Sequence, residues 1–355
     1  MKRYTPHRLL VTGAAGFIGS HFVRHVLETN PDARIVSLDK LTYAGSRDHL
    51  TGLDSTRHRL VVGDICNAEL VGTLLRTHQI DTIVHFAAES HVDRSIASPR
   101  AFIETNVLGT FTLLEAARAY WLENQKGSEF LCRFHHVSTD EVYGSLTSDA
   151  PSFTETHPYQ PGSPYSASKA GSDHLVRAYH HTYGLPVTMS NCSNNYGPHQ
   201  HAEKFIPTVI RACLQHQPIP VYGSGLNVRD WLYVQDHVEA IDQIIRMAAD
   251  GEVYHVGGLA ERTNLDIVKS ICAWMDMNRP WVNSYHTLIT SVEDRLGHDW
   301  RYAMDIEKIQ RELGWVPRVT FEEGLVQTIE YYVRQHSDQI DVSLDNLNRS
   351  LNCIY

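Results

Sequence analysis

The chain has 355 residues, of which 42% are hydrophobic and 20% are charged, values typical of a folded globular protein. Its formal net charge of −10 argues against a nucleic-acid partner. No apolar run approaches the ~20 residues that cross a bilayer and no secretory signal opens the chain, so we expect no membrane partner and a cytoplasmic location.

The first predicted elements are a strand, a glycine-rich turn and a helix. Residues 8–12 are an apolar run, and residues 22–27 show apolar side chains at helical spacing. Between them lie Gly13, Gly16 and Gly19. Such a turn lets the backbone approach a pyrophosphate, which the N–H groups of the helix N-terminus then bind. The pattern predicts a dinucleotide site, although an ordinary tight turn could carry the same glycines.

A second apolar strand, at residues 34–38, ends in Asp39. A carboxylate there would accept hydrogen bonds from the adenine ribose and repel a 2′-phosphate, which favours NAD over NADP. Further strands are predicted at residues 60–63, 82–86 and 134–137, with helical patterns between them. This alternation predicts an α/β fold with a Rossmann-type doubly wound parallel sheet, whose motifs lie at the carboxyl ends of the strands.

Two side-chain pairs indicate chemistry. Tyr165 and Lys169 stand four residues apart at the start of a predicted helix, so both project from one face, and a nearby ammonium favours the phenolate that takes a proton from a sugar hydroxyl. Asp140 and Glu141 follow the strand predicted at 134–137. Two carboxyl groups with separated pKa values suit the removal of water, whereas the alternative is an acidic pair that stabilises a helix N-terminus.

The sheet pattern continues to residue 190, and loops rich in Asn, Gly, Pro and His follow. Because 355 residues exceed what one hydrophobic core usually supports, we predict an NAD-binding Rossmann domain over residues 1–190 and a smaller substrate-binding α/β domain over 191–355. Residues 230–250 resemble a strand and a helix that return to the first domain. The tail from residue 339 is polar, shows little periodicity and indicates no function.

Neither the cysteines nor the histidines form a recognisable metal or disulfide pattern. The six cysteines include no Cys-x-x-Cys pair, which fits reduced thiols in the cytoplasm. The 22 histidines are scattered, and adjacent pairs such as His135 and His136 lack the spacing of a zinc-binding helix. We therefore expect no metal.

Several motifs together resemble the dTDP-glucose 4,6-dehydratases, a family of the extended short-chain dehydrogenase/reductase superfamily. The resemblance runs over nearly the whole chain to about residue 335, through the segments 13–20, 39–45, 87–95, 139–141, 191–198, 227–231 and 295–299. The Thr-Asp-Glu triplet at 139–141 is the motif that is specific to the dehydratases within this superfamily. Sugar epimerases of the superfamily carry small hydroxyl residues where the acid pair stands here.

The resemblance implies which residues hold the ligands. Those assigned to an NAD cofactor are Gly13, Gly16, Phe17, Ile18, Gly19, Asp39, Lys40, Leu41, Thr42, Asp64, Ile65, Ala87, Ala88, Thr105, Tyr165, Lys169 and Asn195. Those assigned to a nucleotide-sugar substrate are Ser90, Thr139, Asp140, Glu141, Asn194, Lys204, Phe205, Pro220, Tyr222, Arg229, Asn264, Arg295 and His298. Arginines can bind a diphosphate through paired hydrogen bonds, and an aromatic ring can stack on a nucleotide base.

The resemblance also implies a reaction that converts dTDP-glucose to dTDP-4-keto-6-deoxyglucose and water. Tyr165, with Thr139 and Lys169, would take the proton of the 4-hydroxyl as hydride passes to NAD. Glu141 would then remove the C5 proton while Asp140, kept protonated, donates to the departing 6-hydroxyl. The hydride returns to C6, so NAD is regenerated in each cycle.

Alternatives stay open at this point. The same reaction could act on UDP-glucose or GDP-mannose, and a dinucleotide-sensing protein could keep the fold without catalysis. The hypothesis of a 4-epimerase is weaker than these, because epimerisation needs no acid at C6, so it leaves the Asp140 and Glu141 pair unexplained. The helical stretches at 101–121 and 165–183 carry apolar residues on more than one face, and the resemblance implies that they form the four-helix bundle of a homodimer. The pathway that the product enters is not encoded in these motifs.

Overall fold

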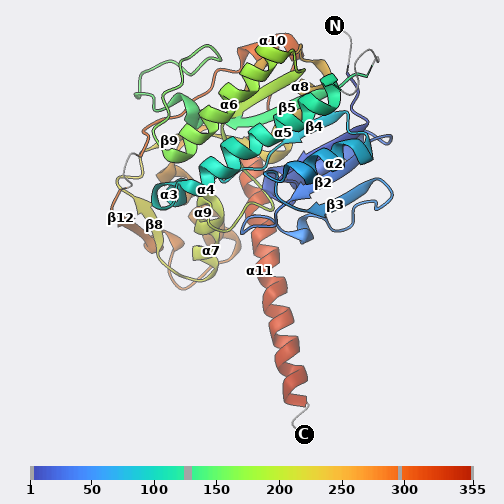
Figure 1. Cartoon of the computed structure of the whole chain (residues 1–355). Helices are drawn as coiled ribbons and strands as arrows, with labels where there is room; N and C mark the ends of the chain where they lie inside the picture. The colour runs from blue at the N-terminus through green and yellow to red at the C-terminus, as the bar shows by residue number, and fades with distance from the viewer. Residues whose placement is uncertain (1–3, 124–129, 295–297, 353–355) are drawn as a thin grey trace.

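The structure, a computed structural model, describes residues 4–123, 130–294 and 298–352. Its centre is a seven-stranded parallel sheet with helices on both faces (Figure 1). The strands lie in the order β10–β6–β5–β4–β1–β2–β3. Their bounds are β1 Arg8–Thr12, β2 Arg34–Asp39, β3 His58–Val62, β4 Thr82–His85, β5 Arg133–Thr139, β6 Val187–Cys192 and β10 Val253–Val256. The predicted α/β fold class is confirmed.

The direction of strand addition reverses between β1 and β4. From β1 the chain moves outward through β2 to β3, returns to β4 on the other side of β1, and continues to β5 and β6. The crevice outside the carboxyl ends of the strands at such a reversal is where doubly wound sheets bind ligands. The five strands predicted in the first 140 residues are all present, with bounds that differ by at most two residues.

Helices cover both faces of this sheet. On one face, α1 (Phe17–Thr29) packs against α8 (Val234–Met247), and both bury apolar side chains against β1. On the other face lie α2 (Ala68–His78), α5 (Thr110–Ala117) and α6 (Pro164–Tyr183), which share a second apolar cluster with β4 and β5. Burial of these amphipathic faces is the main favourable contribution to folding.

The start of α6 is fixed by its local sequence. The hydroxyl of Ser163 accepts the N–H of Ser166, whose hydroxyl in turn accepts the N–H of Ser163, which is a capping box. Pro164 occupies the first helical position, where a missing N–H costs nothing. Gly184 ends the helix in the left-handed region, at a φ of 71°. The helix predicted around 165–183 is therefore confirmed.

The helix predicted at 101–121 is also present, as one helical run. Regular turns at α4 (Arg100–Phe102) and α5 alternate with wider turns at η2 (Ile103–Gly109) and η3 (Arg118–Glu123). Wider turns are frequent near functional sites. Here the first of them carries Thr105, which lines the cavity described below.

A second lobe of short strands lies beside the large sheet. β7 (Asn194–Tyr196), β9 (Val228–Tyr233) and β11 (Glu261–Thr263) form one small sheet, and β8 (Ile219–Tyr222) pairs with β12 (Ile289–Val292). The helices packed on them are α7 Phe205–Leu214, α9 Asn264–Asn278 and α11 Phe321–Asn352. The remaining short helical segments are η1 Arg47–Leu50, α3 Val92–Ala97, η4 Asp140–Tyr143, η5 Tyr285–Leu288 and α10 Glu307–Leu313.

The predicted domain boundary at residue 190 falls inside β6. The segment predicted to return at 230–250 is divided: β9 pairs with β7 and β11 in the small sheet, whereas α8 and β10 complete the large sheet as far as Val256. The extra strand extends the return beyond the predicted limit because β10 pairs with β6. The division into two domains stays a prediction.

The tail from residue 339, for which the sequence indicated no element, continues α11 to Asn352. Figure 1 shows this helix projecting from the body of the molecule. Within the described ranges, no helix combines the length and the apolar character needed to cross a membrane.

Candidate active site

A cavity of about 340 Å³ opens at the carboxyl edge of the large sheet, where the strand order reverses. Its size is that of a small-molecule site. All the predicted catalytic residues and every predicted cofactor residue except Leu41 line it: Gly13, Gly16, Phe17, Ile18, Gly19, Asp39, Lys40, Thr42, Asp64, Ile65, Ala87, Ala88, Thr105, Thr139, Asp140, Glu141, Tyr165, Lys169 and Asn195.

The glycine turn leaves room for backbone alone. Gly13 has a φ of 66°, and a Cβ built on it would lie 2.7 Å from the amide nitrogen of Ala87 at the end of β4. A Cβ on Gly19 would lie 2.2 Å from the carbonyl oxygen of Gly13. Side chains at either position would separate β1, β4 and α1, so the N-terminus of α1 reaches the cavity only because these residues are glycine. The turn fits a dinucleotide pyrophosphate.

Two carboxylates stand on the other side of this turn. Asp39 accepts the N–H of Ala15 at 2.9 Å and that of Leu41 at 2.8 Å. Asp64 lies 2.7 Å from the ammonium of Lys40. Because carboxylates accept hydrogen bonds from ribose hydroxyls and repel phosphate, this end of the cavity fits NAD better than NADP.

The Thr-Asp-Glu triplet connects β5 to η4. The hydroxyl of Thr139 accepts the N–H of Glu141 at 3.3 Å and donates to Asp140 Oδ1 at 3.2 Å. Asp140 is only 2% exposed, and burial, followed by the neighbouring Glu141, raises its pKa well above the usual value. Its Oδ2 is buried without a partner. A protonated carboxyl on the wall of a cavity is the group that a general acid requires.

Tyr165 faces the same cavity from the first turn of α6. Burial first, and the charge of Glu141 second, raise the pKa of its phenol well above 10, and a hydrogen bond with Thr139 acts in the opposite direction. The sequence analysis expected the charge of Lys169 to favour the phenolate, whereas the pKa of the phenol is raised, because burial is the largest influence on it. The Nζ of Lys169 donates to the carbonyl of Val137 at 2.8 Å.

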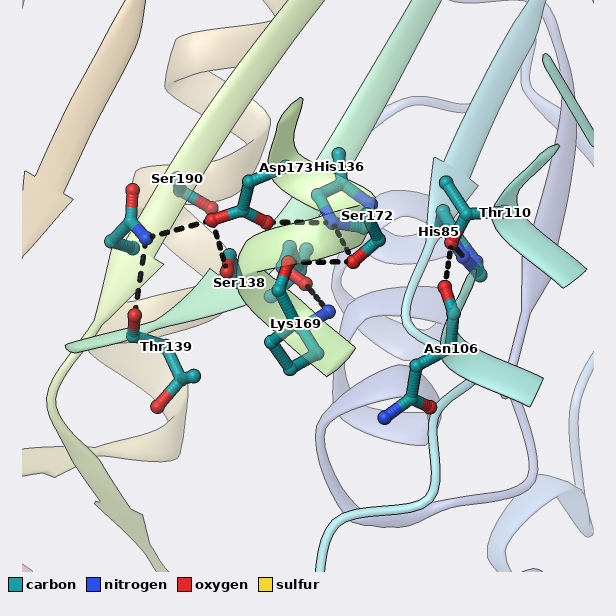
Figure 2. A network of polar contacts seen from close by, with 12 residues as sticks. His85, Asn106, Thr110, His136, Ser138, Thr139, Lys169, Ser172, Asp173 and Ser190 are labelled. Carbon is teal, nitrogen blue, oxygen red and sulfur yellow. Dashed lines mark hydrogen bonds and ion pairs between the residues drawn. The ribbon is translucent and has the colours of Figure 1, made fainter. Parts of the chain in front are cut away.

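A network of buried polar groups supports these residues from behind (Figure 2). Asn106 donates to Ser168 on α6 at 2.8 Å and pairs with the backbone of Glu89, which follows β4. His85 on β4 contacts the hydroxyl of Thr110, which donates to the carbonyl of Asn106. The loop after β4 and the helix that carries Tyr165 are therefore held to one another. Among the described residues, no group of three metal-ligating side chains is arranged to hold an ion.

Comparison with known proteins assigns the chain to a family. A family profile described as GDP-mannose 4,6 dehydratase matches residues 10–328. The dTDP-glucose 4,6-dehydratase of Xanthomonas campestris pv. campestris is 54% identical over 327 residues, which cover 91% of this chain and 92% of that protein. dTDP-glucose 4,6-dehydratase 1 of Escherichia coli K12 is 52% identical over 92% of each chain. The chain belongs to the dTDP-glucose 4,6-dehydratase family.

Solved structures agree with this family assignment. The dTDP-glucose 4,6-dehydratase of Streptomyces venezuelae, crystallised with NAD and dTDP, matches with a TM-score of 0.85 and 47% identity over 93% of this chain and 98% of that one. A UDP-glucose 4-epimerase of Thermotoga maritima, crystallised with UDP-glucose, matches with a TM-score of 0.81 at 27% identity, over 92% of this chain and 99% of that one. Since dehydratases and epimerases share the fold, the fold alone does not separate them.

The residues that the family resemblance assigned to the nucleotide sugar fall into two groups. Ser90, Asn194 and Lys204 line the cavity beside the catalytic residues. The others among the described residues are outside its lining: Phe205, Pro220, Tyr222, Arg229, Asn264 and His298. Arg295 lies outside the described residues. Leu41 is outside the lining as well, because its side chain packs into the core beside β1.

Arg229 shows how the second group differs from the first. Its guanidinium donates to the carbonyls of Val228 at 2.7 Å and Asp299 at 2.9 Å, and it lies 4.3 Å from the ring centroid of Tyr302. Its charge still acts on the dehydratase triplet, since it lowers the pKa of Asp140 against the larger effect of burial. A diphosphate contact by Arg229 stays a prediction.

Several cavity residues were missed by the sequence analysis. Glu89 and Ser138 line the cavity beside predicted residues, and both follow or end a strand, which is the signal that would have found them. Cys192, at the end of β6, carries the same signal. Gln200 and His201 come from the loop before α7, where no periodic pattern marks them.

Three segments meet at the rim of the cavity in what we call the rim cluster, formed by Tyr43, Arg94 and Glu203. The guanidinium of Arg94 lies 3.8 Å from the ring centroid of Tyr43 and donates to Glu203 at 2.9 Å. Next to this cluster, Lys204 donates to the carbonyl of Ser90 at 2.8 Å. The cluster joins the segment after β2, helix α3 and the loop before α7, so it ties the cofactor side of the family's site to the substrate side.

Proposed function

We propose that the chain converts dTDP-glucose to dTDP-4-keto-6-deoxyglucose and water. Membership of the dehydratase family supports the reaction class. The observation that carries it is the carboxyl pair at the end of β5, in which Asp140 is buried with a raised pKa while Glu141 is only partly buried. Loss of water needs one carboxyl that donates a proton and one that accepts a proton, and the two environments differ in the required direction.

NAD is the proposed cofactor, and it would accept the hydride from C4 of the sugar and return it to C6. The glycine turn and the N-terminus of α1 would hold its pyrophosphate, and Asp39 its adenine ribose. Lys169 would hold the nicotinamide ribose. Because the hydride returns within one cycle, nothing in the reaction requires NAD to leave, so we expect purified protein to carry it in near-stoichiometric amount.

The first step needs a base at the 4-hydroxyl, and the proposed base is Tyr165. Burial raises the pKa of this phenol and the hydrogen bond with Thr139 lowers it, so the step depends on groups that stabilise the phenolate. The charge of Lys169 would act in that direction. Thr139, which contacts both the phenol and the triplet, would hold the sugar oxygen in place.

The second step breaks the C5–H and C6–O bonds. Glu141 would take the C5 proton, which the neighbouring ketone makes acidic, while Asp140 gives its proton to the departing 6-hydroxyl, so that water leaves and a C5–C6 double bond forms. The unpartnered Oδ2 of Asp140 is where a hydrogen bond from the carboxyl to that hydroxyl would be made. Hydride addition at C6 and return of the proton from Glu141 to C5 would complete the product. The proton taken up by Tyr165 would then pass through solvent to Asp140, so that both groups are restored for the next cycle.

One assay tests the reaction and its alternatives. The protein is incubated with dTDP-glucose, UDP-glucose and GDP-mannose in parallel, without added cofactor, and the alkali-induced absorbance of a 4-keto sugar is followed. We expect the signal with dTDP-glucose. A signal with another nucleotide sugar alone would reassign the substrate, dTDP-galactose without a keto sugar would indicate an epimerase, and bound NAD without turnover would indicate a binding protein.

We also propose a homodimer in the cytoplasm. Helical segments 92–111 and the end of α6 leave large apolar side chains exposed, namely Ile96, Ile103, Leu108, Phe111 and Tyr183. A four-helix bundle with a second copy would cover them. Free thiols at Cys66, Cys132, Cys192, Cys213 and Cys272 support a reducing compartment. Light scattering should give twice the chain mass of 40.3 kDa, and a monomer mass would overturn the dimer.

A further inference from the structure

A buried carboxylate lies behind the proposed catalytic pair, on the side away from the cavity. Asp173 follows Lys169 by one turn of α6 and is fully buried, and the cavity lining does not include it. Figure 2 shows it between His136 and Ser138 of β5, with Lys169 on the neighbouring turn. Neither the family resemblance nor the proposed reaction gave this residue a role.

Four donors, from strands β5 and β6 and from the segment before α6, converge on the Asp173 carboxylate. Ser138 donates at 2.8 Å and His136 at 3.1 Å from β5, Tyr159 donates at 3.0 Å from the segment before α6, and Asn191 donates at 3.4 Å from β6. A carboxylate in this position is expensive to bury unless its lone pairs are satisfied. The arrangement therefore stabilises the ionised form and fixes α6 against the ends of β5 and β6.

The network does not neutralise this charge. Although burial would raise the pKa of Asp173, the hydrogen bond and charge of His136, followed by the charge of Lys169, hold it below the usual value. His136 is itself uncharged at neutral pH, because burial and then the charge of Lys169 lower its pKa to about 4. Asp173 is therefore an anion, and Lys169 is a charged group that lowers its pKa.

Lys169 depends on that anion. Burial lowers the pKa of its ammonium, and Asp173 is the largest influence in the opposite direction. Arg177, one turn further along α6, is another charged group beside the network, and it donates to the hydroxyl of Tyr159 at 3.3 Å. The remaining titratable groups are neutral at neutral pH: burial raises the pKa of Cys192 on β6 to about 12, lowers the pKa of His85 on β4 far below 6.5, and raises the pKa of Tyr159. Tyr165, on the preceding turn of α6, is protonated as well.

We propose that Asp173 is a positioning residue for the proton-transfer pair, which keeps Lys169 charged behind Tyr165 while the carbonyl of Val137 holds the ammonium. The proposal rests on the proposed roles of Tyr165 and Lys169. An ammonium at this position is useful only while it carries its charge, and a fully buried lysine without a neighbouring anion loses its proton readily. The four donors fix the carboxylate of Asp173, a residue one helical turn after Lys169, and Asp173 stays outside the cavity lining.

The test is the pH profile of the first chemical step in Asp173→Asn. Protein with bound NAD is mixed with dTDP-glucose in a single turnover, and the absorbance of enzyme-bound NADH is followed from pH ~6 to ~9.5, the range in which a perturbed lysine titrates. Loss of the anion lowers the pKa of Lys169, so the alkaline limb should move down by about one to three pH units. The KM should stay near the wild-type value, because Asp173 does not line the cavity.

Asp81→Asn is the matched control. Asp81 is another buried carboxylate that accepts N–H and hydroxyl groups, from His7, Arg8 and Tyr4, but it lies at the amino ends of β1 and β4, opposite the cavity. We expect it to lower the Tm and leave the profile unchanged. If Asp173 has only a structural role, Asp173→Asn will behave in the same way as this control, which overturns the proposal.

A second variant keeps the proposal testable if Asp173→Asn does not fold. Tyr159→Phe removes one donor and leaves the carboxylate in place, so the pKa of Asp173 should rise. In a profile extended down to pH ~4, near the ordinary range of a carboxyl group, the acid limb should therefore move to higher pH. A profile that superimposes on the wild type overturns the proposal. Absence of bound NADH in the wild-type protein would instead reject the proposed function, so the two failures are distinguishable.

Discussion

The two sides of the active site differ in how they present the predicted residues. On the cofactor side, the residues assigned from the sequence converge on one cavity at the ends of parallel strands. On the substrate side, Ser90, Asn194 and Lys204 reach the cavity, whereas Tyr222, Arg229 and others lie outside its lining. The hydrogen bonding of the sheet fixes the positions of residues at the strand ends. The positions of residues in the second lobe depend instead on how that lobe packs against the large sheet.

This contrast indicates which part of the site is preorganised. The large sheet fixes the glycine turn, Asp39 and the Thr-Asp-Glu triplet through backbone hydrogen bonds between neighbouring strands. Arg229 already satisfies its guanidinium with the backbone carbonyls of residues 228 and 299, so a diphosphate would have to compete with these contacts. We therefore expect chemistry to depend on the cofactor side and affinity for the sugar nucleotide to depend on the second lobe.

The largest effect is expected from the carboxyl pair. Asp140→Asn and Glu141→Gln keep the shapes but remove the acid and the base, so dehydration should fall by about 10²–10⁴-fold while bound NADH still forms on mixing with substrate. Tyr165→Phe should instead suppress the formation of NADH. Single-turnover absorbance combined with mass spectrometry of water loss separates the steps. If the Asp140→Asn, Glu141→Gln double variant dehydrates the substrate at the wild-type rate, the pair is not catalytic and only stabilises a helix N-terminus.

A smaller effect is expected in the second lobe. Arg229→Lys keeps the charge but loses the planar fork that grips a diphosphate, so KM for dTDP-glucose should rise by about tenfold with kcat nearly unchanged. The measurement is steady-state kinetics, with retained NAD as a check that the cofactor side is intact. An unchanged KM accompanied by a lower Tm would show that Arg229 serves the fold alone, through its contacts with Asp299 and Tyr302.

The sequence could predict the cofactor side because local patterns there coincide with a rule of topology. Apolar runs mark the strands, and parallel strands carry the residues that follow them, such as Asp39 and Asp140, to one edge. The separation of the carboxyl environments was predicted as well. The raised pKa of Tyr165 was not, since it depends on how deeply tertiary packing buries the phenol.

What the sequence could not predict depends on contacts between distant segments. β7 and β11 have three residues each, too few for a periodic signal, so the split of residues 230–250 between two sheets was not visible. The rim cluster joins Tyr43, Arg94 and Glu203, which are far apart in the chain. In the sequence, Asp173 is an ordinary polar residue of an amphipathic helix. Its role becomes visible only in the structure, where donors from β5 and β6 contact its carboxylate.

The rim cluster provides a test of the boundary between the two sides. Glu203→Gln removes the carboxylate that Arg94 contacts and should loosen the segment that carries Tyr43, so NAD should dissociate several-fold faster, as expected for loss of a partly exposed ion pair of about 1 kcal/mol. Dissociation is followed by the fluorescence of bound NADH during dilution. Glu312→Gln is the matched control, because Glu312 likewise accepts from an arginine, Arg311, but lies in α10 outside the cavity lining.

The effect that isolates the cofactor side without any assay of turnover is on stability. The folded-state pKa of Asp140 is raised well above the model-compound value of 3.8, so between the two values the folded protein binds more protons than the unfolded chain, and its stability falls as pH rises. Asp140→Asn has no proton to lose. Its stability relative to the wild type should therefore increase with pH, by up to about 1.4 kcal/mol per pH unit. Denaturant unfolding at several pH values from ~5 to ~8 measures this slope.

Asp149→Asn is the control. A hydrogen bond from Thr147 lowers the pKa of this exposed carboxyl, so it is ionised in both the folded and the unfolded protein across that range, and no slope is expected. A difference between Asp140→Asn and the wild type that does not change with pH would show that Asp140 is ionised in the folded protein, and the assignment of the general acid would then fail.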